Sequence, residues 1–167
     1  MTLAEQYLPT EDMHPIDMVE SLAEAQDWEF DRIDGDQIAM AVEGQWRTYS
    51  ITLAWSAHDQ TLRLVSTFEL EVEEERRADL HELLNLVNDR VWTGAFTYWP
   101  GQDLMVWRYG LALADAGGAT PAQIDAMIGT AVGAAERFYP AFQLAIWGDT
   151  TPEGAMRAAI AEAYGRA

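Results

Sequence analysis

Residues 46–55, WRTYSITLAW, alternate between large apolar and small polar side chains. Tyr49, Ile51 and Leu53 share one face of the strand that this alternation predicts, and the intervening serine and threonines share the other. Residues 61–70, TLRLVSTFEL, repeat the pattern after a short turn. Two successive strands with one apolar face each predict an antiparallel sheet that is buried on one side and solvated on the other.

More strands and helices are predicted on both sides of this pair. The helices are indicated by apolar residues at helical spacing and by prolines and threonines at their starts. Pro140 is expected to kink or interrupt the longest helix, because proline cannot donate a backbone hydrogen bond. The predicted helices cover residues 15–27, 73–91, 121–147 and 152–164, and the additional strands cover residues 28–33, 37–42, 95–99 and 104–113.

This order of elements predicts an α+β fold. We expect one antiparallel β-sheet of about five to six strands flanked by helices, with extra C-terminal helices. The 167 residues suit a single domain with a sizeable core. The predicted organisation is a flexible lead-in at 1–13, an α+β domain at 14–147 and a C-terminal helical extension at 148–167.

The chain is strongly acidic, with 28 acidic residues against 10 basic ones and a net charge of −18. Residues 1–83 hold most of this charge, with 20 acids and five arginines. Such a surface repels nucleic-acid phosphates and anionic lipids, so we expect neither partner. It would attract a protein with a cationic surface. The same acids also suit a simpler role, which is to keep an aromatic-rich domain in solution.

Residue patterns typical of catalysis are missing from the sequence. There is no cysteine, and none of the three histidines has a partner at metal-ligand spacing. No Gly-x-Ser-x-Gly motif occurs, and the glutamates of residues 69–75 suit a solvated surface. We therefore expect a protein that is not an enzyme and has no cofactor or metal. The absence of a signal peptide and of a membrane span predicts a cytoplasmic location.

Aromatic residues concentrate in the second half of the chain. On the strand at 104–113, Trp107 shares a face with Met105 while Arg108 points the other way. Trp46, Trp99 and Trp107, together with Arg108, are candidates for an interface or a pocket. Large apolar residues at strand spacing also suit a buried core, and the sequence leaves both interpretations open.

Two asparagines lie on one side of the helix at 73–91. Asn85 and Asn88 are poor helix formers, so their presence there costs stability unless their amides are used. They either belong to a solvated flank or fix the helix to a neighbouring loop or ligand. We include both among the candidate binding residues.

The segments LLNLVN at 83–88, GAF at 94–96 and VWRY at 106–109 resemble the YbjN family, whose members are described as regulators of bacterial sensory transduction. Trp46, Arg47 and Tyr49, followed by Phe68, fit the same pattern. The resemblance covers roughly residues 15–147. It implies a fold like that of type III secretion chaperones, commonly dimeric, and a regulatory or chaperone-like role without catalysis.

Two function classes follow from the residues and the resemblance together. The first is a non-catalytic protein-binding module, a homodimeric regulator or chaperone-like adaptor. The alternative is a small-ligand sensor with an apolar pocket between sheet and helices, lined by residues such as Met105, Trp107 and Met127. An exposed apolar sheet face or groove would favour the first, and an enclosed cavity would favour the second.

Overall fold

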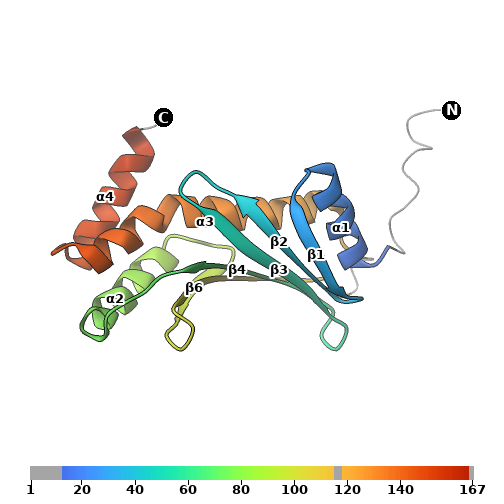
Figure 1. Ribbon diagram of the computed structural model, residues 1–167, viewed down its shortest axis with the longest axis horizontal. Coiled ribbons are helices and arrows are strands. Elements are labelled where there is room, and N and C mark those ends of the chain that lie inside the picture. The colour runs from blue at the N-terminus through green and yellow to red at the C-terminus, as the bar shows by residue number, and fades with distance from the viewer. Residues whose placement is uncertain (1–12, 115–117, 166–167) are drawn as a thin grey trace.

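The computed structural model describes residues 13–114 and 118–165, and Figure 1 shows how their elements are arranged. The expected lead-in at 1–13 lies outside these residues except for Met13. The strands are β1 (Glu29–Asp34), β2 (Gln37–Glu43), β3 (Thr48–Ser56), β4 (Thr61–Glu69), β5 (Ala95–Trp99) and β6 (Leu104–Ala112). The helices are α1 (Pro15–Ala25), the short 3-10 helix η3 (Glu74–Arg76), α2 (Arg77–Asn88), α3 (Pro121–Trp147) and α4 (Pro152–Gly165).

The six strands form one antiparallel sheet in the order β1-β2-β3-β4-β6-β5. The first four strands follow one another as a meander. The chain then leaves through η3 and α2 and returns at the far edge as β5, and β6 closes the space between β5 and β4. The predicted α+β class, with one antiparallel sheet and helices at the C-terminal end, is confirmed.

One face of the sheet forms the core, as the alternation in β3 predicts. Tyr49, Ile51 and Leu53 are fully buried, and their neighbours along the strand are not. Helix α1 contacts β1, β2 and β3, and α3 contacts β4 and β6. The two helices therefore cover the apolar side of the sheet from one end to the other, as Figure 1 shows.

Helix α3 is continuous through Pro140. The interruption, one of the two effects expected of this proline, is therefore absent. Proline removes one backbone hydrogen bond from a helix interior. Phe138, Ala141 and Phe142, on both sides of Pro140, are fully buried. We attribute the continuity to this packing, which holds both halves of the helix against the sheet. At the start of α3, Thr120 and Gln123 form a reciprocal capping box, in agreement with the sequence pattern.

The C-terminal helix α4 packs against α2 and α3. Ala155, Met156 and Ala159 on its inner side are buried. Figure 1 places α4 beside α2, at the end of the molecule opposite α1. The segment predicted as an extension therefore contributes its apolar side to the common core.

Candidate binding surface

The face of the sheet opposite α1 and α3, here called the open face, carries no helix among the described residues. Most of its residues are small or polar and are half-buried or exposed, whereas Val106 is fully buried. Strand pairing aligns them in rows across the sheet. One row contains Asp31, Ala39, Thr52, Val65, Arg108 and Ala95, and the next contains Glu29, Ala41, Ser50, Thr67, Val106 and Thr97.

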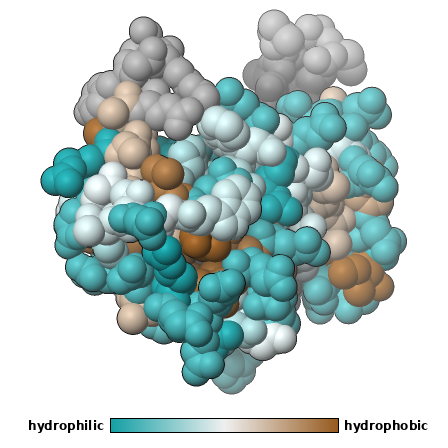
Figure 2. All heavy atoms as spheres, turned by 60° about the vertical axis from the view of Figure 1, so that its left-hand side comes forward, coloured by the Kyte–Doolittle hydropathy of each residue, from teal (hydrophilic) through white to brown (hydrophobic). Residues whose placement is uncertain are grey.

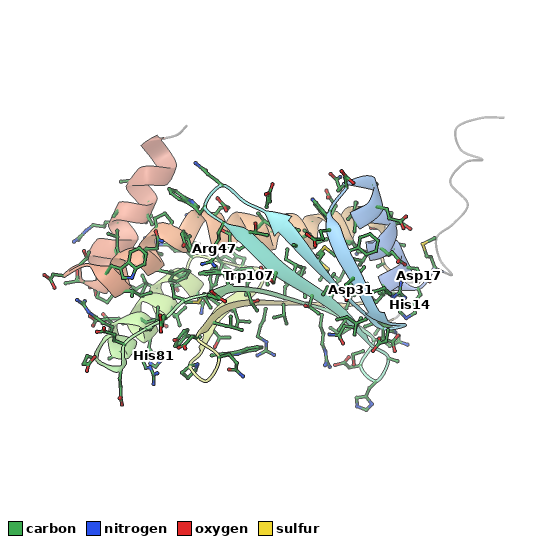
Figure 3. All side chains as sticks on the ribbon, in the orientation of Figure 1. His14, Asp17, Asp31, Arg47, His81 and Trp107 are labelled. Carbon is green, nitrogen blue, oxygen red and sulfur yellow. The ribbon has the colours of Figure 1, made fainter. Side chains whose placement is uncertain are left out.

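Charge is graded along these rows. Glu29 and Asp31 lie on β1, at one edge of the sheet, and Figure 3 labels Asp31 there. Arg108 lies four strands away on β6, about 19 Å along the sheet at the usual strand spacing. The side chains between them are uncharged. Along these two rows, the open face therefore has an acidic end at β1, a neutral centre and a cationic end at Arg108, while Glu43 and Glu69 lie outside the rows at the ends of β2 and β4.

The two arginines of the cationic end differ in their partners. Arg63 donates to Asp59 at 2.7 Å, and Asp59 also accepts a hydrogen bond from Ser56. Together the bonds from Ser56 and Arg63 lower the pKa of Asp59 to about 2. Arg108 is exposed and forms no ion pair with any residue that the structure describes. Arg108 is therefore the arginine on this face that has its charge available for a partner.

A hollow of about 430 Å³ opens at the cationic end of the open face. The small residues Ala95, Thr97 and Gly110 line it together with the two arginines. Trp99, the last residue of β5 and two residues beyond Thr97, is 36% exposed. A hollow of this kind, with cations around small side chains, suits a loop or strand of another protein that carries an acidic or hydrogen-bonding group.

Trp46 and Arg47 do not lie at the hollow on the open face. They lie where the β2–β3 loop contacts α3. The Arg47 guanidinium lies 5.6 Å from the Phe68 ring centre and 5.9 Å from that of Tyr139. Its Nη1 donates to the carbonyl of Glu69 at 3.0 Å. The Trp46 ring lies 6.3 Å from the Tyr139 ring. This cluster fastens the loop to α3, since stacked cations and aromatic pairs stabilise a buried contact.

Arg47 also lines a cleft of about 790 Å³ between the chain after β4 and the last turns of α3. Arg76 and Trp147 stand at the same cleft, among several glutamates. The Nε of Arg47 is buried and has no hydrogen-bond partner among the described residues. The Arg47 side chain therefore has one hydrogen-bond donor that the described residues leave unsatisfied, beside the cleft that Arg47 lines.

The two candidate asparagines of α2 make different contacts in the structure. Asn88 binds β5 through both atoms of its amide: Nδ2 donates to the Phe96 carbonyl at 3.0 Å, and Oδ1 accepts from the Phe96 amide at 2.8 Å. Because β5 is an edge strand, this clamp covers part of its free backbone edge. Asn85 is exposed, and no hydrogen bond of its side chain is found among the described residues.

Trp107 lies in the core, with 1% of its surface exposed and its ring 4.8 Å from that of Phe96. Met105 and Met127, expected to line a sensor cavity with it, are buried in the same cluster. Here they fill the space between sheet and helix. The hollow and the cleft described above both lie elsewhere and open at the surface.

The histidines do not gather at one site. His14 caps α1, since its Nδ1 accepts from the Ile16 amide at 3.1 Å, and its Nε2 lies 2.9 Å from Asp36. Figure 3 shows His81 on α2, far from His14 and Asp17 at the start of α1. Within residues 13–114 and 118–165, no group of three or more His, Asp or Glu residues could hold a metal ion. In the same part of the chain, no helix has the length and apolarity needed to cross a membrane.

Comparison with protein families gives one match. The YbjN family model, described as "Putative bacterial sensory transduction regulator", matches residues 15–144. The chain belongs to the YbjN family. No curated protein and no solved structure matches the chain.

The YbjN match extends from the start of α1 into the last turns of α3 and ends before α4. It therefore contains the whole sheet and both of its faces. The description of the YbjN family is that of a regulator, and YbjN is not a known enzyme family. Sequence reasoning had named Arg108 but had passed over Asp31 and Arg63. Strand alternation places both on the polar face, but their alignment with Arg108 requires the strand order and register.

Proposed function

We propose that this YbjN protein is a non-catalytic regulator that acts in the cytoplasm by binding another protein on the open face of its sheet. The observation that carries the proposal is the uncovered row with Asp31 at one end and Arg108 at the other. Charges of opposite sign on one face favour a single orientation of a partner and disfavour wrong ones. Trp99 and the hollow beside Arg108 supply apolar contact area at the cationic end.

The partner is a protein with a cationic surface. Its basic groups approach the β1 end, where Glu29 and Asp31 stand on the open face and Asp34 and Asp36 follow in the next turn. An acidic group of the same partner meets Arg108. The net charge of −18 accelerates the approach of such a partner and disfavours nucleic acids and anionic membranes.

A site-specific photocrosslinker tests which face the partner uses. Placed in the bacterial host at Thr97 on the open face, it should give a crosslinked protein of defined mass. Placed at the exposed Glu24 on α1, on the opposite side of the sheet, it should not. The same crosslinks from both positions, or none from Thr97, would reject the open face as the binding surface.

Charge reversal tests the proposed orientation. Asp31→Lys and Arg108→Glu should each weaken binding of the crosslinked protein about tenfold or more, as expected for desolvated charges at an interface. Glu24→Lys, an equal charge change on α1, is the matched control and should have little effect. Equal losses for all three variants would show that only the total charge matters.

The alternative, a small-ligand sensor, is favoured by one observation. The cleft at Arg47 has a volume within the range of ligand sites, and the buried Nε of Arg47 lacks a partner there. Native mass spectrometry of protein purified gently from its host should then show a small-mass adduct, and Arg47→Gln should remove it. If the protein shows its unmodified mass, the sensor function is rejected and the protein-binding function remains.

A further inference from the structure

Arg63 and Arg108 are neighbours on the open face. In the pairing of β4 with β6, Arg63 lies opposite Gly110. Two residues further along both strands, Val65 lies opposite Arg108. The two arginines are therefore diagonal neighbours, which are about 7–8 Å apart and within reach of long side chains. Both line the hollow of about 430 Å³ at the cationic end, so guanidinium groups from two different strands border one space.

Small residues keep this space open. Gly110 lies opposite Arg63, and Ala95 lies opposite Arg108 on the other side of β6. A Cβ added at Gly110 would come within 3.3 Å of the Thr61 methyl group, which also lines the hollow. Strands β4 and β6 are paired on both sides, so their backbone groups are already hydrogen-bonded. The polar contacts of a ligand in the hollow must therefore come from side chains.

The hollow lacks the acidic groups that dominate the chain. Figure 2 shows hydrophilic side chains over most of one face of the molecule, and in the whole chain acidic residues outnumber basic ones by 28 to 10. The cleft at Arg47 is lined by three glutamates and Asp103, whereas none of the described residues that line the hollow is acidic. Its polar residues on the open face are two arginines and two threonines. Such a set of donors suits a group that accepts hydrogen bonds and carries negative charge.

The two arginines have most of their hydrogen-bonding capacity free. Arg108 forms neither a hydrogen bond nor an ion pair with any residue that the structure describes. Arg63 makes a single contact, from Nη2 to Asp59 at 2.7 Å, and both side chains of this pair are about half exposed. An exposed ion pair of this kind holds its partners weakly, so Arg63 can turn toward a ligand. The two neighbouring guanidinium groups repel each other unless an anion lies between them.

The arrangement of the two cations favours a phosphoryl group over a carboxylate. A carboxylate lies in one plane and is typically bound bidentately by one guanidinium group. A phosphoryl group presents three acceptor oxygens in different directions, so guanidinium groups from two strands can each bind it. Its charge of roughly −1.5 to −2 also balances two cations.

We propose that the hollow binds a phosphorylated side chain of the partner protein through Arg63 and Arg108. The hollow opens at the surface and is larger than one phosphoryl group, so a free phosphate would leave most of it unfilled. The hollow belongs to the open face, and the partly exposed Trp99 beside it offers contact to residues that flank the phosphorylated one. That a protein carries the phosphoryl group rests on the proposed function, whereas the affinity of the hollow for a phosphoryl group does not.

The first test is a titration of the full chain with an acetylated and amidated alanine peptide that contains one central phosphoserine, followed by NMR chemical shifts. The amide signals of Gly110 and Thr97 and the Nε signal of Arg108 should shift. Replacing phosphoserine by serine should abolish binding. Replacing it by glutamate should weaken binding about tenfold or more, because a carboxylate engages one guanidinium group instead of two.

Variants of the hollow make the titration specific. Arg108→Gln should weaken binding of the phosphopeptide about tenfold or more, and Arg63→Gln about three- to tenfold. Arg157→Gln, an equal change of charge at an exposed position of α4, is the matched control and should bind like wild type. Asp59→Asn should tighten binding, because it removes the carboxylate that competes for Arg63. Glu24→Gln, which removes one charge from α1, should not.

The second test addresses the source of the phosphoryl group. A photocrosslinker at Thr67, on the open face beside the hollow, should give less crosslinked protein after phosphatase treatment of the host extract. Mass spectrometry of the crosslinked protein should locate a phosphorylated residue. A yield unchanged by phosphatase would show that the partner supplies no phosphoryl group, and would overturn the proposal.

The titration can overturn the proposal independently. A serine or glutamate peptide that binds as tightly as the phosphopeptide, or unchanged binding by Arg108→Gln, would do so, and the amide spectra show whether each variant is folded. Crosslinks from Thr97 without phosphopeptide binding would reject this inference and leave the proposed function intact. Phosphopeptide binding without crosslinks from Thr97 or Thr67 would reject the proposed function and the protein source of the phosphoryl group together.

Discussion

The hydroxyl of Tyr49 donates a 2.7 Å hydrogen bond to Oε1 of Glu136 and thereby joins the centre of the sheet to the middle of α3. Burial, and then the bond to the negatively charged Glu136, raise the pKa of Tyr49 far above its ordinary value. The phenol therefore stays protonated at any physiological pH. The same carboxylate oxygen accepts from the Trp46 amide at 3.4 Å, so Glu136 holds both β3 and the loop before it.

Tyr49→Phe should lower the free energy of unfolding by about 1.5–3 kcal/mol, the usual contribution of a hydrogen bond to a charged group. Urea denaturation measures this change. Tyr109→Phe is the control, because the structure shows no hydrogen bond from the half-buried Tyr109 hydroxyl to any described residue. Equal losses for the two variants would show that the bond to Glu136 does not stabilise the fold.

Asn88→Ala should destabilise the protein by about 1–3 kcal/mol, because it leaves the amide and the carbonyl of Phe96 without partners. Hydrogen exchange at the Phe96 amide should accelerate in parallel, since β5 loses its clamp. Asn85→Ala, three residues earlier on the exposed side of α2, should change stability by less than about 0.5 kcal/mol. A stable Asn88→Ala protein with a protected Phe96 amide would contradict the proposed role.

Trp107→Ala should cost about 3–5 kcal/mol, because it empties a fully buried site beside Phe96. Trp99→Ala, at the partly exposed end of β5, should cost less than about 1 kcal/mol and still weaken partner binding. Thermal unfolding and partner binding, measured on the same preparations, distinguish the two effects. Normal partner binding by Trp99→Ala would remove Trp99 from the proposed interface.

The attachment of α4 should depend on pH. A shared hydrogen bond with Glu153 of α4, together with repulsion between the two carboxylates, raises the pKa of Glu82 on α2. A carboxyl group with a raised pKa in the folded state favours folding when protonated. The contact between α2 and α4 should therefore strengthen as the pH falls from 7 toward the ordinary glutamate pKa of about 4.3.

Hydrogen exchange of the α4 amides, corrected for the intrinsic effect of pH, measures this attachment. Glu153→Gln should increase protection at pH 7 and abolish most of its pH dependence. Glu24→Gln, which removes one charge from α1, controls for the change in net charge and should leave α4 unaffected. A pH dependence unchanged in Glu153→Gln would show that the carboxylate pair does not govern the contact.

Much of the fold is predictable from the sequence alone. The alternation in residues 46–55 predicts β3 and its buried side, and Thr120 followed by Pro121 predicts the start of α3. The interruption expected at Pro140 fails for a physical reason. Proline weakens a helix locally, but the buried side chains around Pro140 hold the helix to the sheet and outweigh the missing hydrogen bond.

The candidate site was less predictable. Asn85 and Asn88 have the same side chain, the same helix and almost the same side of it, so nothing in their sequence context tells a solvated amide from a clamp. The free edge of β5 near Asn88 makes the difference. Trp99 and Trp107 were likewise equal candidates, and only their depth in the structure assigns one to the surface and the other to the core.

Local patterns account for the strands, the helices and the polarity of each face, because alternation and helical spacing depend on near neighbours in the chain. Family membership also follows from the order of residues. The row from Asp31 to Arg108 has no such local origin, because it exists only once β1 to β4 and β6 have paired in register. Which side of α3 faces outward likewise depends on which of its residues the sheet has buried. Strand order and helix docking are set by the burial of apolar surface shared among distant segments, and a reading of near neighbours along the chain does not contain that information.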